Sequence, residues 1–215
     1  MKKFVLIIFL VGFCNVFATF EFDILGNLTS STSFPMTESK ANKVNGSTEA
    51  IFGATLQIGN QFSMNNTLKG VSIFAEVLVE QETIALTLPG DTKTVSKKTG
   101  LNLGAGFNTK FIFGSVNSLV PRDTILGFGV GAKILVNAPN VILSTSIPII
   151  TPYVDVFVEQ RFFVSRKLAL ICGLHIGMDM MIFQATDMGA LFNGLYVTAY
   201  PSMNIGLSIG LHFGH

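Results

Sequence analysis

The sequence predicts an all-β fold, an up-and-down antiparallel β-barrel of eight strands that spans a membrane. Three observations carry this prediction. Hydrophobic residues make up 49% of the 215 residues, charged residues make up 13%, and the mean hydropathy of +0.55 is typical of a chain in contact with lipid. Beyond the N-terminus, no apolar run reaches the roughly 18 residues that a spanning helix needs. Apolar and polar residues alternate instead, and only helices and closed barrels satisfy their backbone groups in hydrocarbon.

The first element of the chain, residues 1–18, has the pattern of a secretory signal peptide. Lys2 and Lys3 give it a charged start, and the apolar stretch 4–13 follows. Val16 and Ala18 occupy the −3 and −1 positions of a cleavage site after Ala18. We therefore expect residues 19–215 to form a single barrel domain. Cys172 would then be its only cysteine, which excludes an intrachain disulfide.

Eight segments of this domain are predicted to be strands. In chain order they are 20–28, 48–62, 69–82, 101–114, 124–137, 149–163, 168–182 and 195–213. The first three are separated by polar stretches. The next four alternate Leu, Val, Ile, Ala or Phe with Gly, Asn, Lys or acidic residues. The last is the clearest, because Leu, Val, Ile, Met and Phe hold one parity almost throughout while Tyr, Ser, Asn, Gly and His hold the other.

Alternation alone does not separate a membrane barrel from a soluble, lipocalin-like one with the Leu and Phe parity inside, and that alternative stays open. Glycine on the less apolar face favours the membrane, since a small barrel has a narrow lumen. The connections near 29–47, 83–100, 138–148 and 183–194 are predicted to be long, and those near 63–68, 115–123 and 164–167 shorter, the rhythm of a membrane barrel. Aromatic residues also gather at strand ends, like the two girdles of such barrels. One predicted girdle contains Phe20, Phe62, Phe111, Phe113, Phe162, Phe163 and Phe213, and the other contains Tyr153, Tyr196 and Tyr200.

Three features support a family resemblance: the signal peptide, a mature chain just under 200 residues, and Phe213 near the end of the last strand. With them the protein resembles the small eight-stranded barrels of the OmpA, OmpX and OmpW type. It is also similar to small spirochaete barrels. The resemblance implies the bacterial outer membrane as location and outer-membrane lipid as surroundings. It also implies recognition of the C-terminal strand by the barrel-assembly machinery. Gly214 and His215 follow Phe213, a small departure from the usual aromatic terminus.

Charged residues on the glycine-bearing parity are predicted to point into the lumen, because a Lys or Arg facing lipid at the bilayer midplane costs about 2–4 kcal/mol. These candidates for a lumen charge network are Glu76, Glu80, Lys110, Lys133, Asp155, Glu159 and Arg161. We expect them to form a salt-bridge plug; the alternative is a selectivity network along a narrow path. Apolar residues predicted at lumen positions are Phe74, Leu78, Ile112, Leu135, Phe157 and Ile171. They fill the space or hold a small hydrophobic molecule.

The long connections are the other candidate binding region. The second contains Lys93, Lys97 and Lys98, which could touch anionic glycans or lipid headgroups. A solvated loop is the competing interpretation.

No motif indicates catalysis, so the sequence predicts a protein that is not an enzyme. The glycine run 127–133 lacks the spacing of a phosphate loop and is predicted to be a strand. His175 and Asp179 share a strand face but lie about 13 Å apart, too far to share a metal ion. We expect no cofactor and no metal, and a net charge of +1 gives no reason to expect nucleic acid.

Two functional hypotheses follow. The first is a narrow channel or carrier for small solutes, hydrophobic ones included. The second is a structural or adhesive surface protein with a plugged lumen, whose long loops bind a host or envelope partner.

Overall fold

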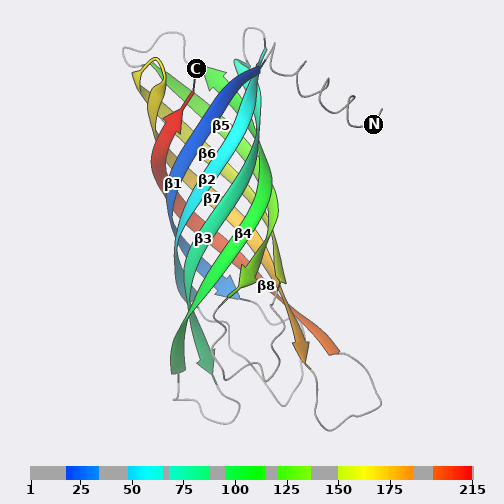
Figure 1. Cartoon of the computed structure of the whole chain (residues 1–215). Helices are drawn as coiled ribbons and strands as arrows, with labels where there is room; N and C mark the ends of the chain where they lie inside the picture. The colour runs from blue at the N-terminus through cyan, green and yellow to red at the C-terminus, as the bar shows by residue number, and fades with distance from the viewer. Residues whose placement is uncertain are drawn as a thin grey trace, which may run out of the picture.

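The computed structural model describes residues 18–33, 48–64, 68–87, 95–114, 121–136, 150–185 and 196–214, which form one closed antiparallel barrel (Figure 1). Its strands are β1 (Ala18–Ser33), β2 (Thr48–Ser63), β3 (Gly70–Thr87), β4 (Val95–Gly114), β5 (Arg122–Leu135), β6 (Ile150–Ser165), β7 (Leu168–Ala185) and β8 (Tyr196–Phe213). Each strand pairs with its neighbours in the sequence, and β1 pairs with β8 to close the barrel. The predicted fold class is confirmed.

The barrel has two distinct ends. The short-turn end contains the start of β1, the end of β8 and the connections 64–69, 115–121 and 166–167. The long-connection end contains the connections 34–47, 88–94, 136–149 and 186–195. The predicted rhythm holds except at 88–94, which is no longer than the connection 115–121 because β3 and β4 continue further than expected.

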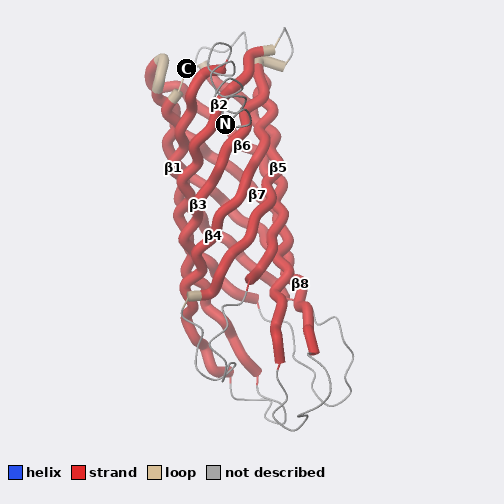
Figure 2. The backbone as a smooth tube through the Cα atoms, turned by 45° about the vertical axis from the view of Figure 1, so that its right-hand side comes forward, coloured by secondary structure: helices blue, strands red, loops and turns tan. Residues whose placement is uncertain are grey.

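Several strands extend past their predicted bounds at the long-connection end. The pairing of β3 with β4 continues to Thr87 opposite Val95, and β7 and β8 remain paired to Ala185 opposite Tyr196. Figure 2 shows both strand pairs running beyond the rest of the barrel wall. Hydrogen-bonded pairing needs only backbone groups, whereas the apolar alternation marks only the part of a strand that faces lipid. The alternation of apolar and polar residues therefore underestimates the length of these strands.

The outer wall is apolar along the barrel. Large hydrophobic side chains of all eight strands are exposed, among them Leu28, Leu56, Val77, Phe107, Val130, Val156, Leu174 and Leu207. The opposite parity points inward and is largely buried, as the alternating burial along β5 and β6 illustrates. This is the facing that the sequence predicts for a membrane barrel. The lipocalin-like alternative, with the Leu and Phe parity inside, is wrong.

Two members of the predicted aromatic girdles lie elsewhere. Tyr153 is buried in the lumen. Phe163 sits at a register irregularity between β6 and β7, and its ring packs edge-on against His212. The side chains of Tyr196 and Tyr200 and all of residues 1–17 lie outside the described part of the chain.

Among the described residues, no helix is long and apolar enough to cross a membrane.

Candidate functional site

The lumen is the candidate functional site. All seven charged residues predicted to face it do so: six are buried and Asp155 is half-buried. They do not form one network. They fall into two clusters, one around Lys110 and Arg161 and one around Lys133.

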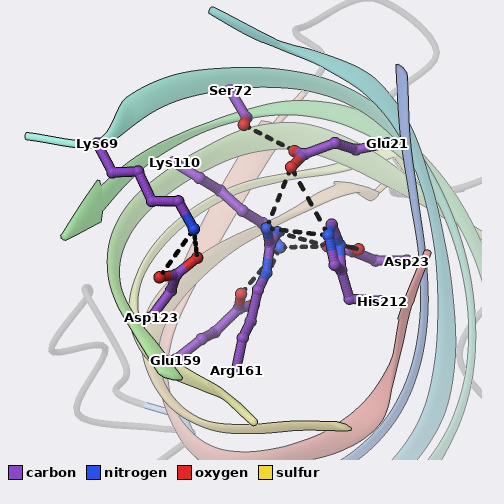
Figure 3. A network of polar contacts seen from close by, with 9 residues as sticks. All are labelled: Glu21, Asp23, Lys69, Ser72, Lys110, Asp123, Glu159, Arg161 and His212. Carbon is purple, nitrogen blue, oxygen red and sulfur yellow. Dashed lines mark hydrogen bonds and ion pairs between the residues drawn. The ribbon is translucent and has the colours of Figure 1, made fainter. Parts of the chain in front are cut away.

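The short-turn cluster consists of Glu21, Asp23, Ser72, Lys110, Glu159, Arg161 and His212 (Figure 3). Lys110 Nζ lies 2.8 Å from Asp23 Oδ2 and 2.9 Å from Glu159 Oε2. Arg161 donates from Nη1 to Glu21 at 3.3 Å and from Nη2 to Asp23 at 3.2 Å. Ser72 donates to the other oxygen of Glu21 at 2.7 Å. These contacts join strands from opposite sides of the barrel.

His212 completes the short-turn cluster from the last strand. Its Nδ1 lies 2.6 Å from Asp23 Oδ1, and its Nε2 lies 3.5 Å from Arg161 Nη1. Because a carboxylate accepts, Nδ1 carries the proton given to Asp23; Nε2 also lies 3.7 Å from Glu21 Oε1. His212 therefore ties β8 to β1 inside the barrel, next to the seam where these strands pair.

Lys69 and Asp123 lie at the short-turn mouth. Their ion pair measures 2.8 Å, and the Lys69 side chain is 49% exposed. The Lys69 ammonium also lies over the ring of Phe163, 5.2 Å from its centroid. This pair covers the mouth without entering the buried cluster.

An apolar layer of inward-facing side chains packs around the short-turn cluster. Phe74, Ile112, Ile125 and Ile171 have no exposed surface, and Phe157 is nearly as buried. The Lys110 ammonium lies 4.9 Å from the ring centroid of Phe74 and 5.5 Å from that of Phe157. The layer thus packs against the charges as well as filling the space between the strands.

The glycines of the lumen face make room for these side chains. A Cβ at Gly127 would overlap the ring of Phe157, and one at Gly131 would overlap the hydroxyl of Tyr153. The run 127–133 lies within β5, as predicted, and its glycines serve packing.

The second cluster, which we call the outer cluster, lies toward the long-connection end. Lys133 Nζ lies 2.8 Å from Glu80 Oε2 and 3.0 Å from Asp179 Oδ2, and it stands over the ring of Tyr153 at 5.2 Å. Glu76 accepts hydrogen bonds from neutral groups: the hydroxyl of Tyr153 donates to it at 2.5 Å, and the amides of Gln57 and Asn108 donate at 3.0 and 2.8 Å.

A cavity of about 90 Å³ opens beside the outer cluster. Its wall includes Gln57, Glu76, Lys133, Asp155, Asp179 and Asn204, with Phe157 and Leu25 toward the apolar layer. His175 also lines it and lies 2.8 Å from Thr29 Oγ1 through its Nε2. The lumen therefore holds a small cavity beside the outer cluster, while the short-turn cluster is tightly packed.

Several buried titratable residues of the lumen are absent from the predicted network. Glu21, Asp23, Asp123, Asp179 and His212 all occupy the inward parity of their strands and are buried. The alternation rule applied to every strand, including the first and last, would have identified them. Their partners could not be found in this way, because a residue's height in the lumen depends on the stagger between strands.

The lysines predicted for the second long loop are placed differently. Lys97 and Lys98 belong to β4, where they pair in register with Ala85 and Ile84, so their assignment to a loop is wrong. Lys93 lies outside the described residues.

No protein-family model matches the chain, and no curated protein matches it either. Solved structures do. The outer membrane protein OprG from Pseudomonas aeruginosa is 11% identical, with 92% of this chain and 96% of that chain covered and a TM-score of 0.47. Neisserial surface protein A is 10% identical, with 89% and 96% covered and a TM-score of 0.40. The outer membrane protease OmpT from Escherichia coli is 7% identical, with 92% and 97% covered and a TM-score of 0.41.

The match to OmpT corrects one prediction. The absence of a catalytic motif led us to expect a protein that is not an enzyme, but a protease is among the proteins of this barrel fold. Barrel architecture is therefore no argument against enzymatic activity, and that prediction is withdrawn. At 7% identity the likeness concerns the fold alone and transfers no activity. With its closed antiparallel wall and apolar exterior, the described part of the chain has the build of an integral membrane β-barrel.

Proposed function

We propose that the protein is a closed outer-membrane barrel with a structural or adhesive role, in which the wall anchors and presents the long connections at the cell surface. This is the second of the two hypotheses drawn from the sequence. The observation that carries it is the filled cross-section of the short-turn half.

Side chains from seven of the eight strands meet in this cross-section with at most 1% of their surface exposed. They are Glu21 and Asp23 of β1, Ser72 and Phe74 of β3, Lys110 and Ile112 of β4, Ile125 of β5, Arg161 of β6, Ala169 and Ile171 of β7, and His212 of β8. A water-filled path past this level would expose some of them. Their burial supports a lumen closed to ions and solutes, and it argues against the narrow channel or carrier.

The shape of the other end supports presentation. The β3–β4 and β7–β8 pairs extend past the rest of the wall toward the long-connection end (Figure 2). In bacterial barrels the longer connections face the outside. Paired strands hold whatever they carry away from the bilayer, where a host or envelope partner can reach it.

Solute flux tests the closed lumen. Vesicles containing the wild-type barrel should release small ions and sugars no faster than protein-free vesicles. The double variant Lys110→Ala with Arg161→Ala removes both cations of the short-turn cluster and should raise the flux, which shows that the assay detects an open lumen. Wild-type flux clearly above protein-free vesicles would overturn the proposal.

Surface binding tests the adhesive role. Cells displaying the barrel are compared with cells displaying a variant in which the connections 34–47, 88–94, 136–149 and 186–195 are replaced by Gly-Ser turns. Adhesion to immobilised glycans and matrix proteins should be lost, while the variant still migrates as a folded barrel on unboiled gels. Adhesion retained by this variant contradicts a role for the connections.

A further inference from the structure

We propose that the cavity beside the outer cluster binds a small organic cation with N–H donors, of the size of methylammonium. Two features of the cavity support this proposal. Its wall contains acceptor oxygens without a donor, and the described residues supply fewer positive charges than its carboxylates would need for balance. This inference goes beyond the proposed function, because a closed barrel does not need such a site.

The two clusters differ in charge balance. In the short-turn cluster, Lys110 and Arg161 face three carboxylates, and His212 adds a ring donor to one of them. Among the described residues that line the cavity, Lys133 is the one Lys or Arg, and it faces Glu76, Glu80, Asp155 and Asp179; Glu159 also reaches the cavity but is paired with Lys110. A concave site lined by one sign of charge with low-dielectric walls concentrates ions of the opposite sign. The cavity therefore favours a cation.

Unpartnered acceptors line the same cavity. Gln57 Oε1, Asp155 Oδ1 and Asn204 Oδ1 are each buried and have no hydrogen-bond partner among the described residues. Gln57 is 4% exposed, and its Nε2 donates to the Glu76 carboxylate. Because a carboxylate accepts, this contact fixes the orientation of the amide and leaves Oε1 as the free acceptor. Buried polar atoms in folded proteins nearly always have partners, so these oxygens indicate a missing donor.

Two glycines leave space beside the Asp155 carboxylate. Gly129 and Gly177 are its register partners on the two neighbouring strands. A Cβ at Gly177 would lie 3.0 Å from the backbone oxygen of Val154 and 3.1 Å from Asp155 Oδ1, whereas a Cβ at Gly129 would make only ordinary contacts, the nearest at 3.6 Å. A methyl group at position 177, but not at position 129, would therefore press against the Asp155 carboxylate.

The size and chemistry of the cavity define the ligand. Its volume is about 90 Å³, smaller than the cavity of about 150 Å³ that holds benzene in an engineered protein, so only a few heavy atoms fit. Within the described ranges, no three His, Cys, Asp or Glu side chains gather closely enough to hold a metal ion. Amide and carboxylate oxygens of the wall can accept hydrogen bonds from the N–H groups of one small cation. The ring of Phe157, also on the wall, offers an apolar contact for the alkyl part of that cation.

The test uses the folded full-length barrel in detergent micelles and isotope-labelled methylammonium observed by NMR. Methylammonium should bind saturably, whereas tetramethylammonium, which has no N–H donor, should not compete. Asp155→Asn should weaken binding about tenfold or more, because a hydrogen bond to a charged group is replaced by one to a neutral amide. Asp123→Asn is the matched control, since Asp123 pairs with Lys69 at the short-turn mouth, and it should leave binding unchanged.

A second pair of variants tests the same site if Asp155→Asn does not fold. Gly177→Ala places a methyl group against Asp155 Oδ1 and should weaken binding, whereas Gly129→Ala should not. No saturable binding to the wild type, equal competition by tetramethylammonium, or equal affinity of Gly177→Ala and Gly129→Ala would each overturn the proposal. Binding in micelles is measured without flux, so failure of this site is distinguishable from failure of the closed-lumen proposal.

Discussion

Lys110 Nζ lies 2.8 Å from Asp23 Oδ2, with both side chains fully buried. The pair joins β4 to β1 across the lumen, and Glu159 of β6 binds the same ammonium from a third direction. A buried charge without a partner is costly, so each member of this cluster depends on the others. Backbone hydrogen bonds between neighbouring strands stabilise the barrel wall. The charge cluster determines how the side chains pack in the lumen.

Removing Lys110 should therefore destabilise the barrel strongly. Lys110→Met leaves Glu159 without the cation it binds and should cost about 3–5 kcal/mol of unfolding free energy. Urea unfolding in lipid vesicles measures this cost. Lys69→Met is the control, because the Lys69–Asp123 pair is exposed on its lysine side and such pairs contribute about 0–1 kcal/mol. Equal losses in the two variants would contradict the importance of the buried cluster.

Tyr153 should contribute through its hydroxyl. Tyr153→Phe keeps the ring under Lys133 but removes a donor to Glu76, and we expect a loss of about 1.5–3 kcal/mol. A double-mutant cycle with Glu76→Gln isolates the contact, and the effect of Tyr153→Phe should shrink in that background. If its effect is the same in both backgrounds, the hydroxyl does not act through Glu76.

Neighbouring glycines on the lumen face of β5 should respond differently to alanine. Gly127→Ala forces a methyl group into the ring of Phe157 and should cost about 1–3 kcal/mol through overpacking. Gly129→Ala meets only ordinary contacts and should stay within about 0.5 kcal/mol of the wild type. Unfolding midpoints of the two variants give the comparison, and similar midpoints would show that the lumen repacks easily around Phe157.

A charge on the lipid face should impair insertion. Leu207 is 59% exposed on the outer wall, and Leu207→Arg should cost about 2–4 kcal/mol if the residue lies near the bilayer midplane. Leu207→Phe keeps the face apolar and serves as the control. The fraction of protein that shows folded migration on unboiled gels after insertion into vesicles reports the effect. Full insertion of Leu207→Arg would place this position outside the hydrocarbon region.

The sequence by itself determined the wall of this barrel. A period of two places Val130 and Leu207 outside and Lys110 and Arg161 inside, and this depends only on the geometry of a strand. It also located all eight strands, although β4 begins earlier than its apolar pattern because backbone pairing continues without apolar side chains.

Only the tertiary structure decided what the inward residues contact. Closing the barrel brings Asp23 of the first strand against His212 of the last, and places Tyr153 against Glu76 instead of at the membrane surface. It also divides one predicted charge network into a densely ion-paired plug and a more acidic cavity. These contacts depend on the stagger and tilt of the strands around the closed wall, which set the height of each side chain in the lumen, and alternation along a single strand carries no information about that height.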